Sequence, residues 1–216
     1  MKNTAEKKPR RAADEELWCS RQREILEAAA RLFARHGYAD TDTQLLADEL
    51  GVGKGTLYRY FPSKQELFLA AADRVMGMLC EHVEAAMAEI DDPLDQIAAA
   101  VRAYLAFFAE HPDFAELLLQ ERAQFKDRKK PTYFQHRDVN VERWRSLYRG
   151  LIAAGRVRTM PVERITDVLS NLMYGTMSAN YFIGPQKSFE EQAADILDVV
   201  FHGILSDTER KRRRPG

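Results

Sequence analysis

The sequence predicts an all-α fold of about nine helices, and three observations support this. Apolar residues recur at three- and four-residue spacing along almost all of the 216 residues, which is the period of a helix with one buried face. Helix-capping residues precede several of these stretches, and glycine or proline follows them. We find no stretch with the strict alternation of apolar and polar residues that a half-buried strand requires.

Three helices are predicted in the N-terminal part. The first has one apolar stripe, formed by Ile25, Ala28, Leu32 and Phe33, and ends at Gly37. A short second helix follows Thr43 and closes at Gly51, since glycine accepts the left-handed conformation that often ends a helix. A third begins near Lys54 and stops at Pro62.

Capping signals mark the later helices. Ser63 and Glu66 form a predicted capping box, in which each side chain would satisfy a free backbone N–H of the other residue, and Ser188 and Glu191 repeat this pattern. Asp92 followed by Pro93 predicts an N-cap and first turn. Further helical spacing resumes at residues 114–118 and at 141–151, where Gly155 ends it, and Pro161 is expected in the first turn of the next helix.

The composition excludes several classes of protein. No apolar run reaches the roughly 18 residues that span a bilayer, and the N-terminus lacks the apolar stretch of a signal peptide, so we expect a cytoplasmic protein without a membrane span. Two cysteines allow neither a disulfide framework nor a cysteine-based zinc site. The five histidines are scattered, and no arrangement of nucleophile and base is evident. We therefore expect no metal, no cofactor and no enzyme activity.

The window GVGKGTLYRYFPSK, residues 51–64, combines glycines, tyrosines and cations without an acid, although the chain has a net charge of only −1. It does not match the phosphate-binding pattern Gly-x-x-x-x-Gly-Lys-Ser/Thr, because Lys54 precedes the last glycine. Such a loop also follows a strand, whereas a helix is predicted here. Residues 43–62 instead have the dimensions of a helix-turn-helix motif.

On the second helix of this motif, a rotation of 100° per residue places Leu57 and Phe61 inward and Gly55 and Arg59 on the opposite side. A glycine allows close approach to a groove, and a guanidinium can donate two hydrogen bonds to guanine. The hydroxyls of Tyr58 and Tyr60 could donate hydrogen bonds to DNA phosphates. Lys64, at the start of the next helix, lies where backbone N–H groups also favour an anion. The predicted DNA contacts are Thr43, Lys54, Gly55, Thr56, Tyr58, Arg59, Tyr60 and Lys64.

With the segments ILEAAARLFARHGYADT (residues 25–41) and LADELGVGKGTLYRYFPSKQELF (residues 46–68), the N-terminal part resembles the DNA-binding domain of the TetR family of bacterial transcriptional regulators. The resemblance covers residues 20–68. Gly53 departs from it, since the family commonly has a serine or another polar residue there. The resemblance implies a homodimer, a ligand cavity in the C-terminal helices and repression by default.

We accordingly expect four segments: a flexible arm over residues 1–18, a DNA-binding domain over 19–68, a helical regulatory domain over 69–206 and a basic flexible tail over 207–216. Aromatic residues in the third segment predict a cavity for an apolar or aromatic effector, lined by Tyr104, Phe108, Trp144 and Tyr174. Glu116, Glu121 and Asp138 are alternatives for a cationic effector. The last two helices, about 161–182 and 188–205, carry Gly175, Ser178 and Ala179 and are expected to form the dimer interface.

Together these features predict a dimeric, ligand-responsive transcriptional regulator. We expect a repressor that binds a palindromic operator and is released by a small molecule. Two alternatives remain open at this stage. An activator could have the same fold, and an all-α adaptor could use the basic window to contact protein instead of a specific DNA sequence.

Overall fold

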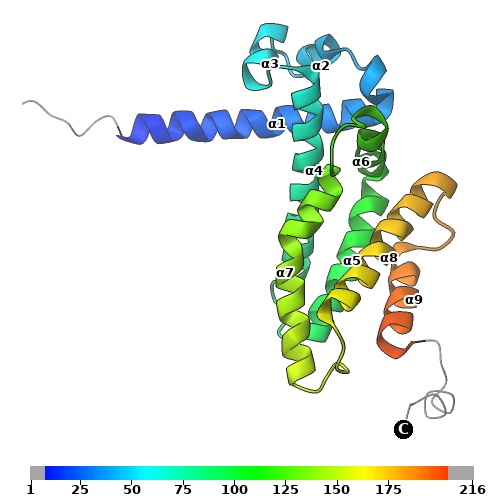
Figure 1. Ribbon diagram of the computed structural model, residues 1–216. Coiled ribbons are helices and arrows are strands. Elements are labelled where there is room, and N and C mark those ends of the chain that lie inside the picture. Colours follow the sequence, from blue (N-terminus) through cyan, green and yellow to red (C-terminus); the bar gives the residue numbers. More distant parts are fainter. Residues whose placement is uncertain (1–7, 204–216) are drawn as a thin grey trace, which may run out of the picture. The chain divides into compact units, whose positions relative to one another are not determined.

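The computed structural model describes residues 8–203, with side chains from residue 17 onward, and in this part of the chain every regular element is a helix (Figure 1). The helices are α1 (Lys8–Asp40), α2 (Thr43–Glu49), α3 (Lys54–Tyr60), α4 (Lys64–Met87), α5 (Pro93–Glu110), α6 (Pro112–Gln124), α7 (Thr132–Ala153), α8 (Val162–Ile183) and α9 (Phe189–His202). The all-α prediction is confirmed.

Most of the predicted breaks and caps lie where the sequence placed them, although Pro161 is the N-cap of α8 and not a residue of its first turn. The backbone leaves the helix at Gly37, at φ 76° and ψ 165°, and Gly51 and Gly155 also have positive φ. Asp92 caps α5 by accepting hydrogen bonds from two backbone N–H groups of its first turn. Ser188 and Glu191 form the complete capping box at α9, and the Ser63 hydroxyl accepts the backbone N–H of Glu66.

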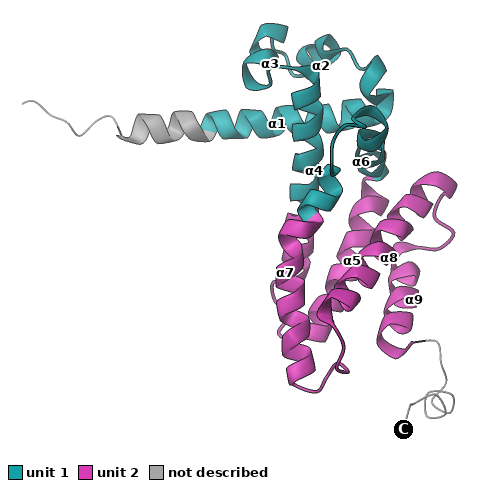
Figure 2. Ribbon diagram, in the orientation of Figure 1, with its two compact units in different colours: residues 1–78, 112–136 teal, residues 79–111, 137–216 magenta. Residues whose placement is uncertain are grey.

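The chain divides into two compact units, coloured separately in Figure 2. Unit 1 contains residues 1–78 and 112–136, and unit 2 contains residues 79–111 and 137–216. The sequence placed the boundary between the DNA-binding and regulatory domains at residue 68. It missed that α6 packs against α1, because a contact between helices so far apart in sequence leaves no trace in the local periodicity of either.

The two termini were predicted as flexible segments. Residues 8–18 instead belong to α1, and the residues around Ala12 and Glu15 are strong helix formers that continue the helix toward the N-terminus. The predicted basic tail, and residues 1–7 of the arm, lie outside the described residues.

The core of unit 1 is built from the inward faces that the sequence predicted. Ile25 and Phe33 of α1 are fully buried, as is Leu57 of α3. Phe33, Tyr38, Phe68 and Phe125 form an aromatic cluster, with successive ring centroids 5.0–6.1 Å apart. This cluster joins α1, α4 and the loop after α6.

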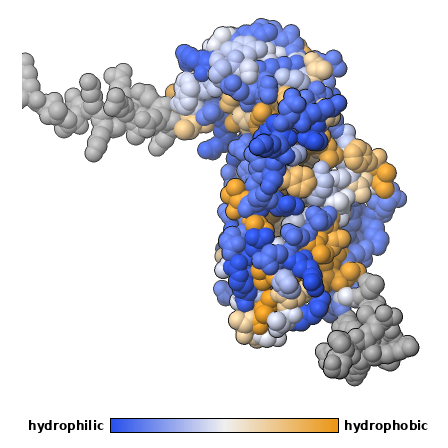
Figure 3. Space-filling model, viewed as in Figure 1, coloured by the Kyte–Doolittle hydropathy of each residue, from blue (hydrophilic) through white to orange (hydrophobic). Residues whose placement is uncertain are grey.

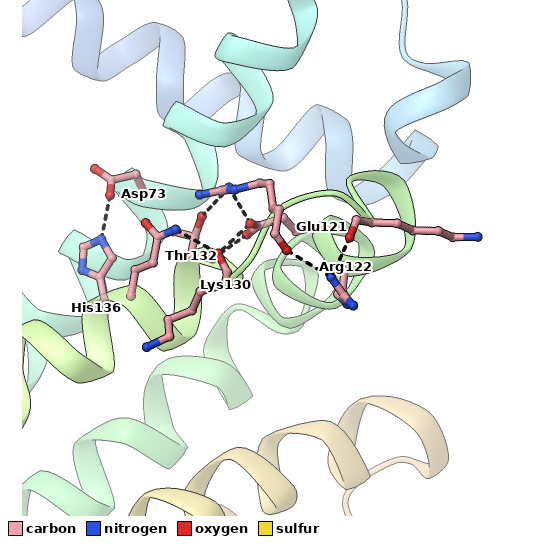
Figure 4. Close-up of polar contacts among 9 residues, drawn as sticks. Asp73, Glu121, Arg122, Lys130, Thr132 and His136 are labelled. Atoms are coloured by element: carbon pink, nitrogen blue, oxygen red, sulfur yellow. Dashed lines mark hydrogen bonds and ion pairs between the residues drawn. The ribbon is translucent and has the colours of Figure 1, made fainter.

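A buried carboxylate fixes the loop between α6 and α7 in unit 1 (Figure 4). Glu121 is 1% exposed and accepts hydrogen bonds from the Arg128 guanidinium and from the backbone N–H of Thr132. This bond sets the start of α7 at Thr132, nine residues before the stripe from which the sequence predicted that helix. Glu121 therefore has protein partners, which account for its charge without a cationic effector. Beside it, His136 lies 2.7 Å from Asp73.

Among the described residues, three apolar clusters hold unit 2 together. One joins α5, α8 and α9 through Val101, Leu105, Met173, Ala193 and Leu197. A second joins α5, α7 and the first turn of α8 through Ile97, Tyr148, Leu151 and Val162. The third joins Met87 to the alanines of α5. Hydrophobic side chains also reach the surface of unit 2, including around the end of α8 (Figure 3).

Candidate DNA interface

The helix-turn-helix consists of α2, a turn and α3. Asp42 begins α2 and accepts the backbone N–H of Gln44 at 2.8 Å. Gly51 has φ 63°, and after it Val52 donates a backbone hydrogen bond to the carbonyl of Ala47. This arrangement turns the chain within four residues, so that α3 starts at Lys54. The predicted motif is thus present in the structure.

The exposed face of α3 is the one that the sequence predicted. Leu57 and Phe61 are 0% and 5% exposed, whereas Gly55 and Arg59 are on the exposed side. A Cβ atom added at Gly55 would meet no atom within 4 Å, so the fold itself does not require glycine here. A close approach by another molecule would explain it.

Gly53, the residue that departs from the family pattern, is the N-cap of α3 and has no side chain to accept a hydrogen bond from the first turn. A Cβ atom there would also meet no neighbour within 4 Å. The position is therefore open to a serine, and the departure removes a capping group without any steric reason in the described structure.

Six of the eight predicted contact residues have a partner within unit 1, and Thr43, Tyr58 and Lys64 are three of these six. The Thr43 and Tyr58 hydroxyls lie 3.0 Å apart, and Thr43 is 3% exposed. It is the only buried residue of the eight, which makes its side chain the least able to reach a phosphate. Lys64 donates to the carbonyl of Ala39 at 3.0 Å and lies 4.9 Å from the centre of the Tyr38 ring.

Lys54 pairs with the carboxylate that caps α2. Its Nζ lies 3.3 Å from Oδ1 of Asp42. The backbone hydrogen bond from Gln44, with a further contribution from Lys54, lowers the pKa of Asp42 from its ordinary value of 3.8. Both side chains are exposed, so a phosphate could compete with Asp42 for the ammonium group.

The aromatic residues at the end of α3 meet an unexpected partner from α1. The Trp18 ring stacks on the Tyr60 ring, with centroids 3.9 Å apart and planes 24° from parallel. The Arg59 guanidinium carbon lies 5.7 Å from the centre of the same indole. One turn further along α1, Arg21 donates to the carbonyl of Leu50 at 2.9 Å.

The sequence analysis missed Trp18 and Arg21. A signal existed, since both continue the stripe of Ile25 backwards at helical spacing, but residues 1–18 were assigned to a flexible arm. Four predicted contacts on α3 are exposed or half-buried and have not been paired with a polar hydroxyl or carbonyl above: Lys54, Gly55, Thr56 and Arg59.

The four residues predicted to line an effector cavity all lie in unit 2. The rings of Tyr104 and Phe108 are 5.1 Å apart, and the Tyr104 hydroxyl lies 3.7 Å from the sulfur of Met177. Trp144 packs instead against the clusters around Tyr148 and Met87. Tyr174 is half-buried on α8.

Two other features of unit 2 bear on ligand binding. The Tyr148 hydroxyl is buried among apolar residues and has no hydrogen-bond partner in the described structure, as is also true of the Ser178 hydroxyl. Separately, an open groove of about 570 Å³ lies between Pro93 and the second half of α7. Its two arginines, Arg143 and Arg156, are paired with Glu84 and Asp92, and none of the four predicted residues lines it.

Among the described residues, no helix has the length and apolar character to cross a membrane. The same residues contain no group of three or more His, Cys, Asp or Glu side chains placed to hold a metal ion.

Two family models match the chain. Residues 25–71 match the model described as "Bacterial regulatory proteins, tetR family". Residues 90–179 match the model described as "Tetracyclin repressor-like, C-terminal domain". The two models cover the helix-turn-helix and most of the helices of unit 2.

Individual proteins agree with these matches. An uncharacterized HTH-type transcriptional regulator of Bacillus subtilis, YerO, is 26% identical over 195 residues, which are 88% of this chain and 66% of that protein. The chain thus spans slightly less than two thirds of the length of this relative. The crystal structure of PfmR, a TetR family transcriptional regulator of Thermus thermophilus, has 28% identity and a TM-score of 0.67 over 84% of this chain and 99% of that one.

A further structure shows the same fold at lower identity. It is the transcriptional regulator FadR of Bacillus subtilis in complex with stearoyl-CoA, with 17% identity and a TM-score of 0.69, covering 84% of this chain and 98% of that one.

Proposed function

The chain belongs to the TetR family of bacterial transcriptional regulators, and we propose that it is a dimeric repressor that binds a palindromic operator through α3. The observation that carries this proposal is the exposed face of α3, where Gly55 leaves room for close approach beside the Arg59 guanidinium. On the opposite side of the same helix, Leu57 is buried in the core of unit 1. Such a face suits a major groove, where arginine reads guanine and glycine lets the helix come close.

The proposed dimer uses α8 and α9 of unit 2. One stripe of α8 is exposed and largely apolar, since Val168, Leu172 and Phe182 are 53%, 38% and 70% exposed. Gly175 and Ala179 lie between them on the same face. Small residues within an apolar stripe allow a second helix to approach closely, and a two-fold dimer buries the same stripe of both copies.

The proposed effector is a small, mainly apolar molecule bound in unit 2. Three apolar clusters provide the environment, and the unpartnered Tyr148 hydroxyl provides a polar point that would fix an orientation. The FadR neighbour was crystallised with stearoyl-CoA, which supports an apolar class. The effector would release DNA only through its higher affinity for a dimer whose α3 helices no longer fit two half-sites. A regulator of this kind acts on cytoplasmic DNA, and the proposal includes no catalytic step.

Sequencing of genomic fragments selected by the purified protein tests the proposal. We expect enrichment of a two-fold symmetric motif by the wild-type protein and loss of that enrichment with Arg59→Ala. Enrichment of no sequence would contradict the proposal and favour a protein-binding adaptor. A reporter gene placed behind the selected motif then tests the sign of regulation: repression lowers its expression, and raised expression would identify an activator.

A further inference from the structure

The first two turns of described side chains in α1 contact the helix-turn-helix at two points, the end of α3 and the end of α2. Trp18 stacks on Tyr60 at the C-terminal end, with ring centroids 3.9 Å apart. Arg21 donates to the carbonyl of Leu50, just before the turn that leads to α3. Because α1 is held in the core from Ile25 onward, these two contacts tie the helix-turn-helix to a fixed element.

We infer that Trp18 is a positioning residue for DNA recognition, which holds the Tyr60 ring and the Arg59 guanidinium in the orientation that meets the groove. This inference rests on the proposed function of α3. Trp18 itself is 41% exposed, which is unusual for an indole whose only task is to fill a core, and both of its partners belong to the predicted DNA surface.

The contacts with Trp18 restrict the orientations of the Tyr60 ring and of the Arg59 guanidinium. One face of the Tyr60 ring is covered by the indole, and a stacked ring loses its freedom to rotate away from the helix. Tyr60 is half-buried, and in the proposed complex its edge and hydroxyl would meet a phosphate oxygen. Arg59 is attracted to the face of the same indole, which narrows the orientations of its guanidinium. Both restraints would be present before DNA arrives, so binding would lose less side-chain entropy.

The two partners predict different consequences of losing Trp18. Tyr60 is expected to contact the backbone, which carries no sequence information, whereas Arg59 is expected to contact a base. Removal of the indole should therefore weaken binding through Tyr60 and also broaden base preference through Arg59. A side chain that only stabilised the fold would lower affinity for all sequences without changing their order.

The test compares Trp18→Ala and Trp18→Phe with the control Leu17→Ala in the full-length protein. Leu17 is the neighbouring residue on α1 and is 70% exposed. We expect Trp18→Ala to weaken binding to the selected operator about two- to tenfold, the range of one aromatic pair. It should also reduce discrimination against operators changed at the position that Arg59→Ala relaxes. Trp18→Phe should restore most of both properties, and Leu17→Ala should resemble the wild-type protein.

Fluorescence gives a second readout, because Trp18 and Trp144 are the only tryptophans. In a Trp144→Phe background, operator DNA should change the emission of Trp18, and this change should be absent with an unrelated duplex. Wild-type affinity and base preference in a folded Trp18→Ala protein would overturn the inference. That result differs from a failure of the proposed function, in which the wild-type protein itself would prefer no sequence.

Discussion

The hydroxyl groups of Thr43 and Tyr58 lie 3.0 Å apart and form a hydrogen bond between α2 and α3. Both residues were predicted as DNA contacts, and the structure pairs them with each other. This bond joins the first residue of α2 to the middle of α3, so it helps to set the angle between the two helices of the motif.

Tyr58→Phe removes one partner of this bond and leaves the buried Thr43 hydroxyl without it. We expect the free energy of unfolding to fall by about 1 kcal/mol, measured by urea denaturation. Thr43→Val should have a similar effect, and the double variant should cost less than the sum of the two, because both single changes break the same interaction. Full additivity would show that the two hydroxyls are not coupled in solution.

Gly55→Ala separates stability from DNA binding. The added methyl group meets no neighbour, and alanine in a helix favours the folded state by roughly 0.5–1 kcal/mol relative to glycine. The melting temperature should therefore rise while operator affinity falls, since the methyl group occupies space needed by the groove. Gly150→Ala in α7 is the control: its position is equally open, and it should raise stability without changing DNA binding. Unchanged operator affinity of the Gly55 variant would contradict close approach at this residue.

Arg59 and Lys64 are expected to differ in the kind of DNA contact. Arg59→Ala should cost about 1–3 kcal/mol of binding to the selected operator and relax preference at one base position. Lys64→Ala should weaken all duplexes similarly and lower the slope of log affinity against log salt by about one. The Lys64 variant also loses the bond to the Ala39 carbonyl, so its melting curve has to accompany the titration. If the slope of log affinity against log salt did not change, Lys64 would not contact a phosphate, and its role would be the hydrogen bond to Ala39 within the fold.

Gly175→Arg tests the dimer. The substitution places a long charged side chain in the middle of the exposed α8 stripe, where nothing in the described subunit lies within 4 Å of an added Cβ. The subunit should therefore still fold, with an unchanged helical circular dichroism spectrum, but elute as a monomer by size-exclusion chromatography with light scattering. Gly150→Arg, on an exposed position of α7, should remain dimeric. If Gly175→Arg and Gly150→Arg both remained dimeric, the dimer interface would not include the α8 stripe around Gly175.

Tyr148→Phe tests the unpartnered hydroxyl in unit 2. Burial raises the pKa of Tyr148 to about 12 from its ordinary value of 10.0. Because burial disfavours the ionised hydroxyl in the folded state, Tyr148 causes no loss of stability below pH 10.0, and the free energy of unfolding falls as the pH rises from 10.0 toward about 12. The decline of the melting temperature over this range should be shallower in the variant.

At neutral pH the same variant loses a buried hydroxyl that has no hydrogen-bond partner among the described residues. We expect Tyr148→Phe to be as stable as the wild-type protein or more stable by about 1 kcal/mol. Once an effector is found by thermal-shift screening, the variant should bind it more weakly, because the effector would be the missing partner. Clear destabilisation without effector would show that the hydroxyl has another partner in solution.

The sequence alone determined the helical architecture, the glycine breaks, the caps at Asp92 and Ser188, and the exposed face of α3 with Gly55 and Arg59. These features depend on helical periodicity and on residues within one or two turns of each other, and such short-range rules can be read along a chain. The resemblance to the TetR family came from the same stretch, and the family models agree with it.

Only the tertiary structure decided the remaining relationships. It paired Thr43 with Tyr58 and placed Trp18 on Tyr60. It also shows that the Glu121 carboxylate accepts the backbone N–H of Thr132 at the start of α7, and that α6 packs against α1 within unit 1. Each joins residues far apart in the sequence, where the partner depends on which helix faces are buried together. Periodicity shows that a helix has a buried face, but not which other helix will cover it.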